Sequence, residues 1–229
     1  MTTKVKAVVF GIDDVLYDAT YQTTNARLSA VRAMIEAGLP VDVETAYRTL
    51  EEIVKELGPD NTKHFDKLLE RLGLKWNPSV VAAGVVAYRE TGPVFLKPYP
   101  DTMPTILRLR ESGFKVGCAS SGKSVKQWQK LVSLGLQHCF HSVVISEDLG
   151  LQAFSREVID EVVKRLGADG SETVYIGTNP KAEIRIANEA HVIAVRLLKG
   201  DSRSEKKIEP RPMHEIEKLS EIFQLVQHL

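Results

Sequence analysis

Acidic side chains follow the first stretch of this chain that has the pattern of a buried strand. Residues 5–10 are mostly apolar and β-branched, which predicts a strand covered on both faces, and Gly11, Asp13 and Asp14 come directly after it. Open α/β sheets bind their ligands at the carboxyl ends of parallel strands. Acidic residues in such a place are candidates for ligand chemistry, and Asp13 is the first of them. The competing interpretation is that Asp13 and Asp14 serve the turn and the start of the next helix.

Hydroxyl and ammonium groups follow a second predicted strand, at residues 114–119. The residues concerned are Ser120, Ser121, Gly122 and Lys123. They precede a predicted helix, and the N–H groups at the start of a helix attract anions. These four residues therefore predict a binding site for phosphate or carboxylate. A plain helix start, capped by Ser121 or Ser124, explains the same residues equally well.

Residues 117–124 read GCASSGKS and match the phosphate-binding pattern G-x-x-x-x-G-K-[ST]. The match lies between a strand and a helix, as a nucleotide-binding loop does. However, Gly117, Cys118 and Ala119 continue the pattern of the buried strand, which leaves little loop before the helix. A nucleotide-binding module is therefore the third of our hypotheses.

Alternating helix and strand patterns predict the elements that position these groups. We expect five strands, at residues 5–10, 114–119, 142–146, 173–176 and 192–197. The helices expected around them lie at residues 101–112, 125–135, 154–166, 181–190 and 216–226. Such alternation predicts an α/β fold, a Rossmann-like three-layer sandwich with a parallel sheet.

Four further helices interrupt this alternation. They are expected at residues 23–38, 43–57, 61–72 and 77–89, with short loops between them. Such a segment favours a four-helix bundle inserted into the α/β fold as a cap. The predicted domains are therefore an α/β core, residues 1–16 and 96–229, and a helical cap, residues 17–95. The charged residues 200–212 are expected to form an exposed loop.

Composition narrows the classes of protein to which the chain can belong. Its 229 residues are 43% hydrophobic, enough for a substantial core, and its 30 basic and 30 acidic residues cancel. A zero net charge gives no attraction for nucleic acid or an anionic membrane, and no apolar run reaches the ~20 residues of a membrane helix. The two cysteines suit a reduced, cytoplasmic protein better than a disulfide framework. The partners left open are a small anionic ligand, a second copy of the chain in a homodimer and another protein.

The order of these features resembles the haloacid dehalogenase superfamily. Residues 11–16, GIDDVL, follow its first motif, Asp-x-Asp-x-Thr/Val-Leu, and Ser120 with Gly122 follows the second, in which a hydroxyl group grips the phosphate. Residues 147–150 keep the Glu-x-x-Gly turn that precedes the third motif. The resemblance implies a hydrolase of the phosphatase or 2-haloacid dehalogenase type with a helical cap. It also implies that Asp13 is the acid/base residue, and that active phosphatases of this type use Mg²⁺.

Four positions depart from the motifs of that superfamily. They are Gly11 in place of the nucleophilic Asp, Ala153 in place of a Lys, Thr178 in place of a metal-binding Asp, and Glu183 in place of a further Asp. Asp13 cannot stand in for a carboxylate at position 11, because residues two apart on a strand lie about 6–7 Å apart. The coordinated loss favours a catalytically degenerate member that keeps an anion-binding pocket between core and cap. No metal cofactor is expected, since Mg²⁺ binds through carboxylates.

An active hydrolase with rearranged groups is the alternative. Asp13 or Asp14 would then act together with Glu183. A relocated lysine, Lys123 or Lys181, would replace the missing ammonium. Attack on a bound phosphate would require a carboxylate within about 3–3.5 Å of it.

Overall fold

The computed structural model describes residues 4–199 and 209–229. The chain divides into two compact units, each with its own hydrophobic core. We call them the α/β unit, Met1–Asp18 with Lys97–Leu229, and the helical unit, Ala19–Leu96.

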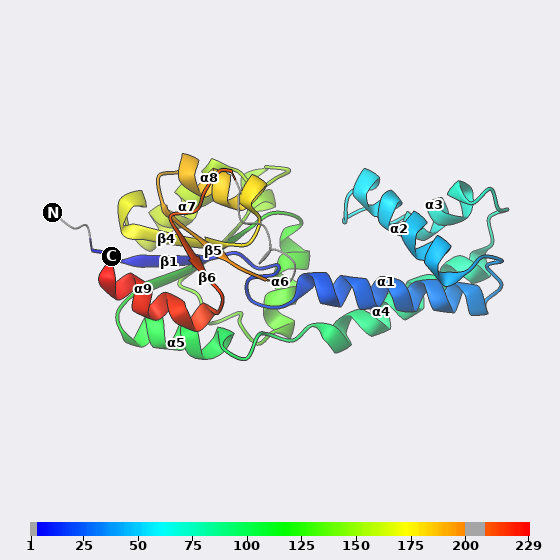
Figure 1. Cartoon of the computed structure of the whole chain (residues 1–229), viewed down its shortest axis with the longest axis horizontal. Helices are drawn as coiled ribbons and strands as arrows, with labels where there is room; N and C mark the ends of the chain where they lie inside the picture. Colours follow the sequence, from blue (N-terminus) through cyan, green and yellow to red (C-terminus); the bar gives the residue numbers. More distant parts are fainter. Residues whose placement is uncertain (1–3, 200–208) are drawn as a thin grey trace. The chain divides into compact units, whose positions relative to one another are not determined.

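Six parallel strands form the centre of the α/β unit (Figure 1). They are β1 (Ala7–Phe10), β2 (Lys115–Ser120), β3 (Ser142–Ile145), β4 (Thr173–Gly177), β5 (Ile193–Leu197) and β6 (His214–Ile216). Their order across the sheet is β3-β2-β1-β4-β5-β6. β1 pairs with β2 and β4, and all four of its residues are buried, as its apolar sequence requires. The predicted α/β fold with a parallel sheet is therefore confirmed.

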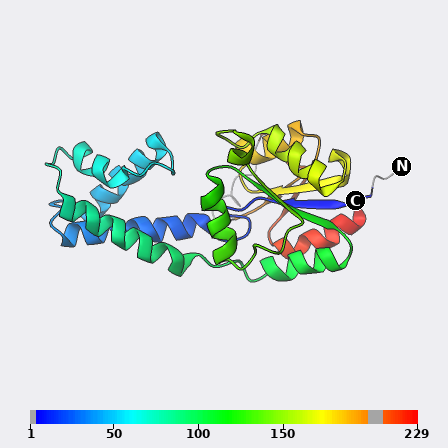
Figure 2. The same ribbon diagram turned by 180° about the vertical axis from the view of Figure 1, so that it is seen from behind.

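Helices lie against both faces and one end of this sheet (Figure 1, Figure 2). They are α5 (Thr102–Glu111), α6 (Ser124–Ser133), α7 (Arg156–Leu166), α8 (Arg185–Glu189) and α9 (Ile222–His228). α7 and α8 lie on one side of the strands, and α5 and α9 lie on the other (Figure 1, Figure 2). In both views α6 lies at the end of the sheet where β1 and β2 finish. The three layers form the expected Rossmann-like sandwich.

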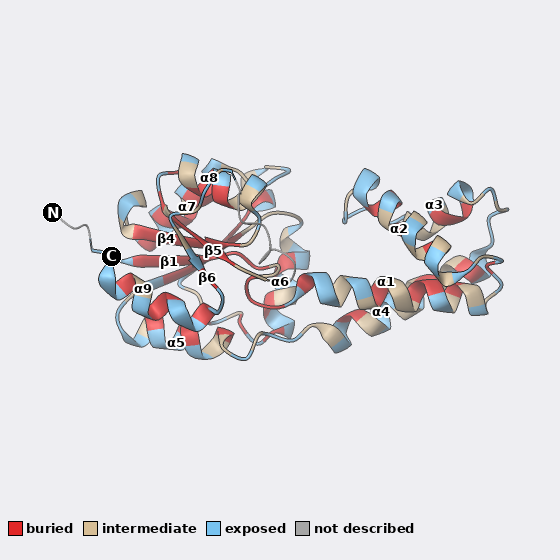
Figure 3. Ribbon diagram, in the orientation of Figure 1, coloured by how far each residue is buried: buried red, intermediate tan, exposed pale blue. Residues whose placement is uncertain are grey.

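Buried side chains explain why these elements form. Strands β1, β2, β4 and β5 are mostly buried, whereas β6 and the helices also have exposed residues (Figure 3). In α7, Val158, Val162 and Leu166 recur every four residues and are buried against the sheet, which is the apolar stripe of an amphipathic helix. The helix ends at Gly167, whose φ of 66° is a left-handed conformation that glycine adopts without strain.

Four helices make up the helical unit. They are α1 (Ala19–Glu36), α2 (Val43–Leu57), α3 (His64–Arg71) and α4 (Pro78–Phe95). α2 begins where the Asp42 side chain accepts a hydrogen bond from the Thr45 N–H, and Asn77 caps α4 in the same way. α1 and α4 pack closely, because a Cβ on Gly84 of α4 would lie 2.7 Å from the sulfur of Met34. None of the described helices combines the length and the apolar character that a membrane crossing needs.

Three parts of the sequence differ from what their patterns predicted. Strand β6 was not expected, since three residues are too few for a period-two pattern. The helix expected at 181–190 begins instead with a π-helical turn, η3 (Pro180–Ile184), in which the Ile184 N–H donates to the Asn179 carbonyl at 3.1 Å. Most of the loop expected at 200–212 lies outside the described residues.

Candidate functional site

Asp13 lies just beyond the carboxyl end of β1 and is held by two side chains. Its Oδ1 accepts a hydrogen bond of 2.7 Å from the Tyr17 hydroxyl. The Lys130 ammonium, which comes from α6, donates to Oδ1 at 2.7 Å and to Oδ2 at 2.8 Å. The Asp13 side chain is 42% exposed and that of Lys130 is 26% exposed. The result is a solvent-accessible carboxylate and ammonium pair at the edge where ligands bind to parallel sheets.

A tight turn after β1 places Asp13 in this position. The Ile12 carbonyl accepts hydrogen bonds from the N–H groups of Val15, at 3.4 Å, and Leu16, at 3.0 Å. Asp14 has a φ of 59°, in the left-handed region where Asp is commoner than most residues. Val15 and Leu16 are fully buried and anchor the turn. The two aspartates therefore belong to the turn, as one interpretation of the sequence proposed, while Asp13 also faces Lys130.

The predicted anion site at 120–123 makes several contacts within the chain. The Gly122 N–H donates to the Ser146 hydroxyl at 3.1 Å. The Lys123 ammonium donates to Glu147 Oε1 at 2.7 Å, and this hydrogen bond is the main reason why the pKa of Glu147 lies below its usual value. Lys123 therefore points to Glu147 rather than to Asp13, and its predicted contact with an external anion stays a prediction.

The start of α6 is capped by acidic side chains from η1 (Ser146–Leu149). The Ser124 N–H donates to Glu147 Oε2 at 2.8 Å, and the Ser124 hydroxyl donates to Asp148. The Ser121 carbonyl accepts a hydrogen bond of 2.8 Å from Gln127. Neither Ser121 nor Ser124 caps the helix with its own hydroxyl, so the interpretation that one of them is the cap is wrong. Ser120, at the end of β2, makes a long contact of 3.5 Å with the Ser121 carbonyl.

The structure contradicts the hypothesis of a nucleotide-binding loop at 117–124. Gly117 to Ser120 are strand residues of β2, so the first half of the pattern is not a loop. A Cβ on Gly117 would lie 2.9 Å from Leu166 and 3.0 Å from Val162, both on α7. Gly117 therefore allows a helix to pack closely on the sheet, and the likeness to a phosphate-binding loop is a coincidence of residue types.

A carboxylate from another element lies beside Gly11. The Gly11 N–H donates to the Ile176 carbonyl at 2.9 Å, which continues the pairing of β1 with β4. A Cβ built on Gly11 would lie only 3.0 Å from Oε1 of Glu183 and 3.1 Å from Val15. Gly11, which stands where the family has its nucleophilic Asp, is therefore adjacent to Glu183. The side chain of Glu183 is one methylene longer than the Asp that the family has at that position.

Backbone and hydroxyl donors fix the Glu183 carboxylate. Its Oε2 accepts hydrogen bonds from the N–H groups of Thr178, at 2.9 Å, and Asn179, at 3.0 Å. Its Oε1 accepts one of 3.2 Å from the Tyr175 hydroxyl. Burial raises the pKa of Glu183, and the negative charge of Asp13 raises it further, whereas the three donors oppose the shift. The π-helical turn of η3 aims this side chain back toward the end of β4.

Two other titratable groups line the same end of the sheet. Cys118 on β2 and Tyr175 on β4 are fully buried, and burial raises the pKa of each well above its usual value. The Cys118 thiol therefore stays protonated, so it is not a reactive thiolate.

The residues in place do not fit a magnesium site. In the part of the chain that the structure describes, no three His, Cys, Asp or Glu side chains lie close enough together to hold a metal ion. Both oxygens of Asp13 are bound by Lys130, and those of Glu183 are bound by N–H and hydroxyl groups. Thr178 contributes a hydroxyl and Gly11 contributes no side chain. We therefore derive no step that depends on a metal.

Lys130 and Tyr17 are the site residues that sequence reasoning missed. Lys130 lies in the last turn of a helix whose direction the sequence does not reveal. Of the two lysines expected to replace the missing ammonium, Lys123 binds Glu147 and Lys181 lies on the exposed side of η3. Ala153 is exposed in the turn before α7. The structure therefore brings together Asp13, Glu183 and Gly11, and adds a lysine from an unexpected element.

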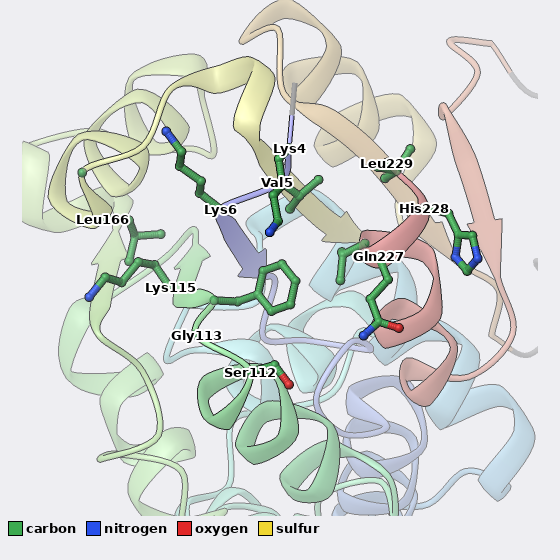
Figure 4. Close-up of a pocket in the computed structure, with 13 residues that line it drawn as sticks. Lys4, Val5, Lys6, Ser112, Gly113, Lys115, Leu166, Gln227, His228 and Leu229 are labelled. Atoms are coloured by element: carbon green, nitrogen blue, oxygen red, sulfur yellow. The ribbon is translucent and has the colours of Figure 1, made fainter. Parts of the chain in front are cut away.

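A separate hollow lies at the opposite end of the sheet, where β1 and β2 begin (Figure 4). Its volume is about 1110 Å³, and Lys4, Lys6 and Lys115 are among its lining residues. The Lys6 ammonium is bound to Glu172 at 2.7 Å. In Figure 4 the ammonium groups of Lys6 and Lys115 point away from each other, so they do not converge on one ligand.

Comparisons with known proteins agree with this fold. A family model described as haloacid dehalogenase-like hydrolase matches residues 5–191. A glyceraldehyde 3-phosphate phosphatase from Methanopyrus kandleri is 45% identical over an alignment of 232 positions, which covers 98% of this chain and 98% of the relative. A glyceraldehyde 3-phosphate phosphatase from Methanocaldococcus jannaschii is 35% identical, again over 98% of each chain.

Solved structures resemble the chain along its whole length. A putative beta-phosphoglucomutase from Thermotoga maritima has a TM-score of 0.74 at 18% identity, and the match covers 98% of this chain and all of that one. A phosphatase from Thermococcus onnurineus has a TM-score of 0.68 at 24% identity, covering 97% of this chain and 98% of that one. At these identities the likeness concerns the fold alone.

Proposed function

This chain belongs to the haloacid dehalogenase-like hydrolase family, and we propose that it is a phosphatase that hydrolyses a small phosphate monoester. The substrate class that we propose is a three-carbon phosphate ester of the glyceraldehyde 3-phosphate type. Support comes from two relatives that match the chain from end to end and whose names state this activity.

The pair formed by Asp13 and Lys130 is the observation that carries the proposal. An ammonium has three N–H donors, and Lys130 donates to both oxygens of Asp13. These contacts hold the Lys130 ammonium beside the carboxyl end of β1. The remaining donor can bind a phosphate oxygen, together with the Ser120 hydroxyl at the end of the neighbouring strand. This ammonium would do the work of the lysine that is missing at Ala153.

The expectation that hydrolysis has been lost is weakened by the comparisons. That expectation depended on Gly11, Ala153 and Thr178, each of which lacks the group that the motif requires. The end-to-end relatives are named as working phosphatases, and a carboxylate, that of Glu183, lies beside Gly11. Rearranged catalytic groups therefore account for the site better than their complete loss.

A second function, binding of a phosphorylated ligand without turnover, is favoured by the absence of a side chain at Gly11. The Asp13–Lys130 pair would then hold the anion and no group would attack it. The anion-binding pocket expected between core and cap stays a prediction.

Phosphate release from glyceraldehyde 3-phosphate distinguishes the two functions. We expect saturable release by the wild-type protein, and a fall in kcat of at least about 100-fold in Asp13→Asn, a change that removes an acid/base group. The Asp13→Asn protein, purified identically, also measures spontaneous release and contaminating phosphatases. Equal release by both proteins, combined with saturable calorimetric binding of the ester, would contradict phosphatase activity and support binding alone.

A further inference from the structure

The two oxygens of Asp13 differ in how many hydrogen bonds they accept. Oδ1 accepts one from the Tyr17 hydroxyl and one from the Lys130 ammonium, each of 2.7 Å. Among the described residues, Oδ2 accepts only from Lys130, at 2.8 Å. Each oxygen of a carboxylate offers about two acceptor positions, so Oδ1 is filled and Oδ2 keeps one position open. Because the side chain is 42% exposed, a substrate can reach that position.

The two partners of Asp13 differ in how firmly they can orient its carboxylate. The Lys130 ammonium is a compact charge on a flexible four-carbon stem, and its donors rotate. Tyr17 has a rigid ring and is only 1% exposed, so the surrounding packing fixes its hydroxyl. Its backbone is held as well, by β-bridges to Asp13 and to Pro98. Lys130 therefore balances the charge of the carboxylate, whereas Tyr17 fixes which oxygen stays available.

We propose that Tyr17 is a positioning residue, which occupies Oδ1 of Asp13 so that Oδ2 is the oxygen that exchanges a proton with the reacting group. The inference rests on the proposed phosphatase function and on the acid/base role of Asp13 within it. One proton moves between Oδ2 and an oxygen of the reacting group, so one O–H bond breaks and another forms. Tyr17 keeps its own proton and touches no substrate, and nothing is oxidised or reduced.

The turn after β1 explains why Asp13 needs this support. Asp13 lies beyond the last paired residue of the strand, and the next residue, Asp14, has a φ of 59°. An exposed carboxylate in such a turn can rotate about its side-chain bonds, and a misplacement of about 1 Å can lower a rate about 100-fold. Val15 and Leu16, which are fully buried, fix the chain between Asp13 and Tyr17. The same turn therefore carries the carboxylate and the hydroxyl that orients it.

Tyr17→Phe tests this role, because it removes the hydroxyl and keeps the buried ring. We expect kcat for phosphate release from glyceraldehyde 3-phosphate to fall about tenfold or more, since a hydrogen bond to a charged group is lost. KM should change less than about threefold, because Lys130 still binds the phosphate. The matched control is Tyr47→Phe, which removes the hydroxyl of a partly buried tyrosine in the helical unit and should leave kcat unchanged. Circular dichroism and melting curves establish that both variants are folded.

The same substitution in an Asp13→Asn background separates positioning from general support of the fold. There Tyr17→Phe should change the rate less than about twofold, because the oriented group no longer transfers a proton. Single-turnover assays with protein in excess measure these low rates. An equal fall in both backgrounds, or an unchanged kcat in Tyr17→Phe alone, would overturn the role of Tyr17 and leave the phosphatase function intact. Absence of phosphate release by the wild type would refute the phosphatase function itself, on which this role depends.

Discussion

Lys130 joins α6 to the end of β1 through both oxygens of Asp13. An ammonium that is only partly exposed and already fixed in place loses little conformational entropy when it also binds a phosphate oxygen. Its contribution should therefore appear in substrate binding more than in the chemical step.

Lys130→Gln is expected to raise KM for the phosphate ester about tenfold or more, equivalent to about 1.4 kcal/mol of binding free energy. Steady-state kinetics of phosphate release measure this effect. Lys126→Gln changes an exposed lysine on the same helix and serves as the matched control. An unchanged KM in Lys130→Gln, or an equal rise in both variants, would remove Lys130 from the phosphate site.

Glu183 should also make stability depend on pH. Its pKa is higher in the folded chain than the ordinary value of 4.5, because burial disfavours the charged form. The folded state therefore binds the proton more tightly, and the contribution of this group to stability is lost as pH rises from 4.5 through the raised value.

Glu183→Gln abolishes this titration. The free energy of unfolding of the variant minus that of the wild type should increase as pH rises from 4.5 through the raised pKa of Glu183. Above that pKa the difference should level off. Urea unfolding of both proteins at several pH values between about 4 and 8 measures the difference. A difference that stays constant, or decreases with pH, would contradict the raised pKa.

The length and burial of each secondary-structure element determine whether its sequence pattern could predict it. The strands β1 to β5 were predictable because buried parallel strands are short apolar runs bounded by polar residues. β6, with three residues, has too short a pattern. The contact of Lys130 with Asp13 depends on the direction that α6 takes after β2, and no local pattern records that direction. The glycine and lysine spacing at 117–124 matched a nucleotide-binding loop by coincidence. A glycine in a strand cannot be distinguished from a glycine in a loop by residue type alone.

The π-helical turn η3 is the element that positions Glu183. Its start is capped by the Asn179 side chain, which accepts hydrogen bonds from the N–H groups of Lys181, at 3.0 Å, and Ala182, at 3.2 Å. π turns are rare and occur often at functional sites, where the extra residue redirects a side chain. Sequence reasoning expected a regular helix here and could not foresee the direction of Glu183.

Asn179→Ala should lower the free energy of unfolding by about 1 kcal/mol, the usual effect of removing such a cap. It should also lower kcat, since the Glu183 carboxylate beside Gly11 is no longer held in place. Urea unfolding and phosphate release measured on the same preparation provide both values. Asn77→Ala removes a comparable cap from α4 in the helical unit and should lower stability without lowering kcat. Equal effects of the two variants on kcat would show that the position of Glu183 in η3 does not affect turnover.

The whole molecule has two hydrophobic cores, one in each unit. The core of the helical unit includes Leu50, Ile53 and Leu68, and these residues do not belong to the core cluster under the sheet. Proteins unfold locally in cooperative units that differ in stability. A cavity in the core of one unit should therefore make that unit unfold at a lower free energy than the other.

Leu50→Ala is therefore expected to cost about 2–5 kcal/mol, as other buried leucines do, with the loss confined to the helical unit. Hydrogen exchange should show faster exchange in the amides of α1 to α4 and unchanged protection in β1 and β4. The reciprocal variant, Val162→Ala, should speed hydrogen exchange in the strands of the α/β unit and leave protection in α1 to α4 unchanged. Loss of protection throughout the chain in both variants would show that the two units unfold together.

The rate of phosphate release from glyceraldehyde 3-phosphate shows whether this chain hydrolyses a phosphate ester although Gly11 has no side chain. Wild type, Asp13→Asn and Glu183→Gln should be purified in parallel and assayed at the same protein concentration. Hydrolysis by rearranged groups predicts saturable turnover by the wild type and a loss of at least about 100-fold in each variant. Indistinguishable rates for the three proteins would contradict it.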